Sequence, residues 1–79
     1  MLTEKQKIVL KLHSRGKNVA EISQETGYNR KTVYYALKSG QIKLDKVIET
    51  IKFAVRNRIL TREQVSRLED ILKKLTQER

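Results

Sequence analysis

Few residues in this chain could interrupt a helix, and that limits what it can fold into. The 79 residues include no proline and only three glycines, Gly16, Gly27 and Gly40. Glycine and proline are the residues that most often punctuate regular structure. Elsewhere in the chain, apolar residues recur at the three- and four-residue steps of amphipathic helices. We therefore expect an all-α fold with interruptions at the three glycines.

Two helices are expected before Gly27. Each begins with a capping residue that is followed three residues later by a side chain able to bond back to it, Thr3 by Gln6 and Asn18 by Glu21. The first helix should run from there to Gly16, and the second over about 19–26. Gly27 lies where a chain that reverses direction needs a left-handed residue, four residues after the small Ser23.

A third helix is expected over about 30–39, capped by Asn29 and stopped by Gly40. It would bury Val33 and Leu37, which are one turn apart. Its outward-facing residues would be Arg30, Lys31, Tyr34 and Lys38. A helix, a tight turn and a second helix with a basic outer face form a helix-turn-helix, which sets its second helix into the major groove of DNA.

The pattern changes after the third glycine. The segment QIKL could be briefly extended, and from Leu44 apolar residues return at helical spacing, with Asp45 as the expected cap of a fourth helix. Thr61 and Gln64 repeat the capping-box spacing at the start of a fifth helix. We therefore expect a break near 58–60 and an antiparallel helical hairpin.

The whole chain is expected to form one compact domain, with a helix-turn-helix region at 1–40 and a helical hairpin at 41–79. The hairpin could complete the core of the monomer. It could instead form a dimer, because a chain of this size buries only about 60% of its unfolded surface and large exposed apolar patches associate. We favour the dimer, since two recognition helices about 34 Å apart can contact two half-sites of a palindrome. The expected interface residues are Ile51, Val55, Val65, Leu68, Ile71, Leu72 and Leu75.

Three features of the first half form a pattern known from regulatory proteins. They are an LTEKQ opening, Ser23 four residues before Gly27, and Val33 six residues after it. With these features, residues 2–39 resemble the tri-helical helix-turn-helix of Tfx-type archaeal regulators, LuxR-type effector domains and region four of sigma factors. Ser23 replaces the usual alanine but keeps the small volume. The resemblance covers about half of the chain and implies DNA binding.

The charge balance favours a polyanionic partner. The chain has 18 basic and 9 acidic residues, a net charge of +9 and a pI near 10.1. Residues 1–43 carry +6 of this charge and residues 44–79 carry +3. DNA, RNA and anionic membranes all attract such a chain. The helix-turn-helix pattern in the more basic half favours double-stranded DNA.

Other classes of function lack the residues they need. There is no cysteine, a single histidine, His13, and no phosphate-binding glycine loop. We therefore expect no enzyme, no metal or other cofactor, and no small-molecule ligand. An apolar run of about 18 residues and a signal peptide are also missing. The expected location is the cytoplasm, in association with the nucleoid and without a membrane partner.

The expected base contacts lie on the first turn and the outer face of the third helix: Asn29, Arg30, Lys31 and Tyr34. Arg30 can bond guanine O6 and N7, whereas Asn29 could bond adenine or serve only as a cap. Of Tyr34 and Tyr35, one is expected to pack on the first helix and the other to point outward. The expected contacts to the DNA backbone are Lys17, Asn18, Thr32, Tyr35 and Lys38.

These features together favour a dimeric, sequence-specific transcription regulator, and a repressor because little chain is left for a sensing domain. Three alternatives are a small architectural or nucleoid-type DNA-binding protein, an adaptor that binds a partner through its last two helices, and the DNA-binding module of a transposase or recombinase. RNA is less favoured, because the chain lacks the exposed aromatic platform on which single strands stack.

Overall fold

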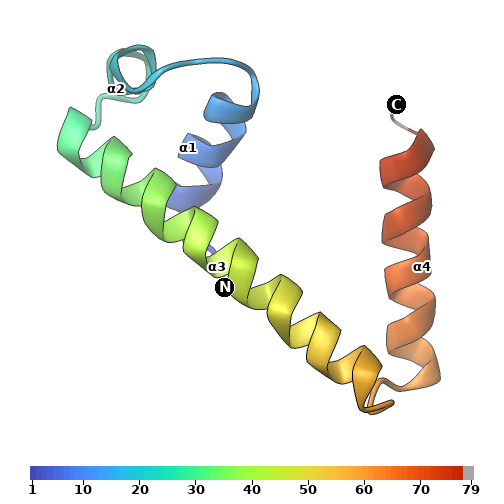
Figure 1. Ribbon diagram of the computed structural model, residues 1–79. Helices are drawn as coiled ribbons and strands as arrows, with labels where there is room; N and C mark the ends of the chain where they lie inside the picture. Colours follow the sequence, from blue (N-terminus) through green and yellow to red (C-terminus); the bar gives the residue numbers. More distant parts are fainter. Residues whose placement is uncertain (78–79) are drawn as a thin grey trace. The chain divides into compact units, whose positions relative to one another are not determined.

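The computed structural model describes residues 1–77 and places four α-helices and no strand within them. The helices are α1 (Glu4–Ser14), α2 (Val19–Thr26), α3 (Arg30–Arg56) and α4 (Arg62–Gln77) (Figure 1). The all-α prediction is confirmed for this part of the chain. None of the four helices has both the length and the apolar character needed to cross a membrane.

Contacts within the chain define two compact units, Met1–Ile48 and Glu49–Arg79, which we call the N-terminal unit and the C-terminal unit. The division falls inside α3. The N-terminal unit therefore contains α1, α2 and the first two thirds of α3, and the C-terminal unit contains the end of α3 together with α4.

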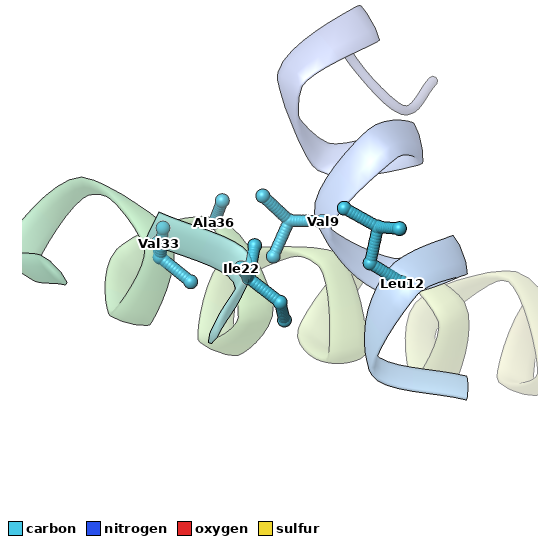
Figure 2. Close-up of a cluster of buried hydrophobic side chains, with 5 residues drawn as sticks. All are labelled: Val9, Leu12, Ile22, Val33 and Ala36. Carbon is cyan, nitrogen blue, oxygen red and sulfur yellow. The ribbon is translucent and has the colours of Figure 1, made fainter. Parts of the chain in front are cut away.

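The core of the N-terminal unit lies where its three helices meet (Figure 2). It consists of Val9 and Leu12 from α1, Ile22 from α2, and Val33 and Ala36 from α3. Burying one valine, leucine or isoleucine side chain contributes about 1.5–3 kcal/mol. This small cluster is therefore the main apolar contribution to the stability of the unit.

Both capping boxes predicted in the first half are confirmed. At the start of α1, the Gln6 amide donates to Thr3 Oγ1 over 3.2 Å, and the Thr3 amide donates to Gln6 Oε1 over 2.9 Å. At the start of α2, Asn18 and Glu21 exchange the same pair of bonds. The predicted starts of these two helices are correct for this reason, because the residues that set them lie three positions apart.

The predicted end of the third helix at Gly40 is wrong, and so are the extended QIKL segment and the separate fourth helix from Leu44. Instead, α3 continues through Gly40 to Arg56. Gly40 is buried, and a β-carbon there would lie 2.7 Å from Leu10 Cδ1. Glycine in a helix costs only about 1 kcal/mol relative to alanine. The glycine therefore permits a close contact between α1 and α3 and does not end the helix.

Hydrogen bonds around Gln6 hold α3 against α1 on both sides of that glycine. Gln6 is buried, and its Nε2 donates to Ser39 Oγ over 2.8 Å. Its Oε1 accepts from Lys43 Nζ over 2.9 Å, and the same ammonium donates to the Met1 carbonyl. These bonds order the turn of α3 in which the sequence pattern predicted a break. Asp45 lies inside α3 and does not cap a helix, contrary to the prediction.

In the C-terminal unit, the predicted break near 58–60 is confirmed. The Ile59 amide donates to the Ala54 carbonyl over 3.1 Å, and the Arg58 amide donates to the Val55 carbonyl over 3.2 Å. This pair of bonds is the Schellman motif, in which one residue takes the left-handed conformation. Arg58 takes it here, with φ of 55°.

The start of α4 also matches the prediction. Thr61 and Gln64 exchange both bonds of a capping box, over 2.9 and 3.1 Å. None of the residues of α4 is buried. Ala54, at 8% exposure, is the one buried residue among those described in the C-terminal unit. This unit therefore has almost no apolar core of its own.

Candidate nucleic-acid interface

The connection between α2 and α3 is a closed turn centred on Gly27. Gly27 has φ of 81°, and its amide donates to the Ser23 carbonyl over 2.9 Å. The Ser23 hydroxyl donates to the Tyr28 carbonyl, and the Tyr28 amide donates to Thr26 Oγ1 over 3.2 Å. The left-handed conformation predicted for this glycine is confirmed. The polar groups of this turn form hydrogen bonds with one another. The direction in which α3 leaves α2 is therefore set by residues of the turn itself.

Asn29 caps α3, as the sequence suggested it could. Its Oδ1 accepts from the Thr32 amide over 2.8 Å, and its carbonyl accepts from the Val33 amide over 3.1 Å. A bidentate contact to adenine would need the same side-chain oxygen. A base contact by Asn29 would therefore compete with the cap, whereas the side chains of Arg30 and Lys31 remain exposed beside it.

The first half of α3 has a buried face and a basic face. Val33 and Ala36 point into the core of the N-terminal unit. The exposed residues on the other face are Arg30, Lys31, Tyr34, Tyr35 and Lys38. The fold therefore brings three of the expected base-contacting residues onto one surface with two of the expected backbone-contacting residues.

This surface has positive charge without nearby acidic side chains in the sequence. The segment 26–44 contains no aspartate or glutamate, and the first turn of α3 has no acidic residue. Cations at a helix N-terminus oppose the helix dipole, at a cost of about 0.3–1 kcal/mol each. Arg30 and Lys31 therefore do not stabilise α3. Their charges and the positive end of the helix dipole attract an anion together.

The expectation that one of the two adjacent tyrosines packs on the first helix is met only in part, because neither is buried, although Tyr35 lines a cavity with Lys5 and Gln6 of α1. Tyr34 and Tyr35 are 58% and 57% exposed. Their rings meet edge to face, with centroids 6.3 Å apart, and Lys31 Nζ lies 5.9 Å from the centre of the Tyr35 ring. Both phenol groups are therefore accessible beside the basic side chains.

The other residues expected to contact the DNA backbone are already partly engaged. Lys17 forms an ion pair with Glu25, and Asn18 caps α2 through its Oδ1. Thr32 is half-buried, at a small cavity of about 270 Å³ that Tyr35 also lines. Lys38 is exposed. A phosphate contact by Lys17 would require the ammonium to leave or share the Glu25 carboxylate.

Gln41 belongs to the same surface and was missed by the sequence analysis. It is exposed, and with Tyr34, Lys38 and His13 it lines a shallow cavity of about 260 Å³. Its positions three and seven residues after Lys38 and Tyr34 place it on the same helix face. The spacing was visible in the sequence, but the predicted stop at Gly40 left Gln41 outside the helix.

The seven residues expected at a dimer interface all lie in the C-terminal unit. Ile51 and Leu68 are half-buried, and the other five are exposed, among them Leu72 at 60%. An open groove of about 450 Å³ runs through this unit, lined in part by Val55, Leu68 and Leu72. The C-terminal unit therefore has apolar side chains that stay exposed, because neither α3 nor α4 covers them within the unit.

Comparisons of the chain with protein-family models, with curated proteins and with solved structures give no match.

Proposed function

We propose that this chain is a sequence-specific regulator of transcription, a repressor, that binds double-stranded DNA through a helix-turn-helix. In this proposal α2 and α3 are the two helices of the motif, Gly27 forms its turn, and the start of α3 enters the major groove. The observation that carries the proposal is the exposed basic face of α3, which has no acidic residue between positions 26 and 44.

The side chains on that face suit the edges of bases. The guanidinium of Arg30 can donate two parallel hydrogen bonds to guanine O6 and N7, and the ammonium of Lys31 can donate to the same atoms. The exposed Tyr34 hydroxyl can donate or accept. Lys38 and Tyr35 lie beside these residues and are assigned to phosphate, which positions the protein without conveying sequence. Sequence preference is therefore assigned chiefly to Arg30, Lys31 and Tyr34.

We further propose that the protein acts as a homodimer formed through the C-terminal unit. A two-helix hairpin with one buried alanine is not stable by itself, because isolated helices of this length are marginal in water. Covering an apolar side chain that is more than half exposed contributes roughly 1 kcal/mol or more. Four of the expected interface residues, Val55, Ile71, Leu72 and Leu75, are exposed to this extent, and four on each of two chains can offset the association cost of about 4–15 kcal/mol. Two α3 helices would then contact two half-sites.

A second candidate is a sequence-neutral architectural protein, and the net charge of +9 favours it equally. Such proteins rely on phosphate contacts and DNA deformation. The two candidates differ in what they predict for Arg30 and Tyr34. These side chains determine affinity for a preferred sequence in the first case and contribute only general attraction in the second.

A competition experiment separates the candidates. A pool of random duplexes would be enriched for sequences that the protein retains, and the selected duplex would then compete against random duplex at fixed salt. A specific regulator should prefer the selected duplex by about 1,000-fold or more. Equal affinity for the two would assign the chain to the architectural class. An absence of binding to either duplex would overturn DNA binding altogether.

A further inference from the structure

The turn between α3 and α4 is strongly basic. Between Glu49 and Glu63 the sequence has no acidic residue. The basic residues of this segment are Lys52, Arg56, Arg58 and Arg62. Three of them lie at the turn itself, Arg56 at the end of α3, Arg62 at the start of α4, and Arg58 between the two helices. We call Arg56, Arg58 and Arg62 the arginine turn.

The arginine turn forms no ion pair in the described part of the chain. Lys52 and Arg67, which flank it, pair with Glu49 and Glu63 respectively. None of the three turn arginines forms an ion pair within residues 1–77, and all three are exposed. Their guanidinium groups are therefore available to an external anion.

Two of the three arginines lie where helix stability would favour another residue. Arg62 is in the first turn of α4, where the helix dipole disfavours a cation. Arg58 has φ of 55°, a left-handed conformation that glycine or asparagine adopts at lower cost. A role outside the fold explains why arginine occupies both positions.

We propose that the arginine turn binds the phosphate backbone of double-stranded DNA, as a contact separate from the start of α3. This inference rests on the proposed function, which supplies the duplex. A guanidinium group binds phosphate oxygens through two parallel hydrogen bonds and stays charged at all relevant pH values. Backbone contacts carry no sequence information. The turn therefore raises affinity for every duplex equally and leaves the preference for a selected sequence unchanged.

The test compares two triple variants with the same loss of charge in the C-terminal unit. The first is Arg56→Gln, Arg58→Gln, Arg62→Gln, and the matched control is Arg67→Gln, Lys73→Gln, Lys74→Gln. The binding constant for random duplex is measured over a range of salt concentrations. The slope of log K against log salt is negative, and each lost phosphate contact reduces its magnitude by about 0.9. We expect the magnitude of the slope to fall by about 2–3 in the first variant and by less than 1 in the control.

Several outcomes decide the matter. Equal slopes in the two triple variants would overturn the inference, because net charge alone would then explain the effect. The Arg56→Gln, Arg62→Gln double variant leaves the left-handed position unchanged and should reduce the magnitude of the slope by about 2. An unchanged slope would again overturn the inference.

Binding to vesicles of phosphatidylglycerol and phosphatidylcholine is measured in parallel. Loss of vesicle binding with intact duplex binding would assign the turn to membranes and reject the DNA contact.

The same measurements keep this inference separate from the proposed function. If the arginine turn has no role, the slope is unchanged while the selected duplex is still preferred over random duplex. If the specific-regulator proposal is wrong, that preference is absent in the unmodified protein, whereas the slope still responds to the turn variants.

Discussion

Leu10 of α1 packs directly against Gly40 of α3. A β-carbon added to Gly40 would lie 2.7 Å from Leu10 Cδ1 and 3.2 Å from Leu10 Cγ. Real β-carbons do not approach another heavy atom to the shorter of these distances, so any side chain at position 40 requires Leu10 to move. Glycine at this point therefore leaves room for the Leu10 side chain between the two helices.

This contact predicts that the effect of Gly40→Ala changes sign with the residue at position 10. In the unmodified protein, the clash should cost about 1–3 kcal/mol and outweigh the roughly 0.5–1 kcal/mol that alanine contributes in a helix. In a Leu10→Ala background the clash is absent, so Gly40→Ala should stabilise by about 0.5–1 kcal/mol. Urea unfolding of the four proteins in this double-mutant cycle measures both values. Additive effects would mean that the two residues are not in contact.

The two Thr-x-x-Gln capping boxes provide a matched pair for a second prediction. Gln6 and Gln64 make the same two cap bonds, but only Gln6 also bonds Ser39 and Lys43. A typical hydrogen bond contributes about 1 kcal/mol net. Gln64→Ala should therefore cost about 0.5–1 kcal/mol, and Gln6→Ala about 2–3 kcal/mol. Thermal unfolding followed by circular dichroism compares them. Similar losses for both would show that the bonds to α3 contribute little.

The sequence predicted those features that depend on neighbouring residues. The capping boxes at Thr3, Asn18 and Thr61 and the left-handed Gly27 are each determined within about four positions. The course of α3 through Gly40 was not predicted, because it depends on contacts with Leu10 and Gln6, which lie more than 25 residues away in the sequence. A glycine that ends a helix and a glycine that admits a neighbouring helix look alike until that neighbour is known.

The candidate site follows the same division. Arg30, Lys31 and Lys38 are exposed, as helical spacing from Val33 indicates. The exposure of both tyrosines could also have been derived, since the buried positions 33, 36 and 40 leave 34 and 35 on the opposite side of the helix. Contact of these residues with DNA stays a prediction.

Arg30→Ala tests whether α3 conveys sequence preference. Loss of a bidentate contact to guanine should weaken binding to a selected duplex by about 1–3 kcal/mol and binding to random duplex much less. Lys38→Ala is the matched control, because loss of a phosphate contact should weaken both equally. Titrations of both duplexes at one salt concentration measure the difference. Equal losses in the Arg30 variant would restrict Arg30 to phosphate contact.

Leu72→Glu tests the proposed dimer. Leu72 is 60% exposed in the single chain, so the substitution should leave the helices intact. A charge facing apolar partners in an interface costs several kcal/mol, so the dissociation constant should rise at least about 100-fold. Ser66→Glu adds the same charge to another face of α4 and should leave association unchanged. Sedimentation equilibrium at micromolar concentration measures all three proteins. A monomeric unmodified protein that melts cooperatively would refute the dimer.

Gly27 provides the last prediction, because its environment isolates the effect of backbone conformation. Its φ is 81°, and a β-carbon there would meet no atom within 4 Å. Any loss of stability on substitution must therefore come from the left-handed conformation, which costs non-glycine residues about 1–2 kcal/mol. Gly27→Val should reach or exceed the upper end of that range, since β-branched residues tolerate positive φ least. Gly27→Asn, which adopts this conformation more readily, should cost clearly less.

The two variants also connect the turn to the proposed function. If the turn sets the angle between α2 and α3, Gly27→Val should reduce affinity for duplex DNA by more than it reduces helix content, because α3 can stay helical while it loses its orientation. Circular dichroism and a gel shift on the same samples separate the two quantities, and Gly27→Asn should retain most of both. Full DNA binding and an unchanged melting temperature in Gly27→Val would show that the turn does not orient α3, and would contradict the assignment of α2 and α3 to a helix-turn-helix.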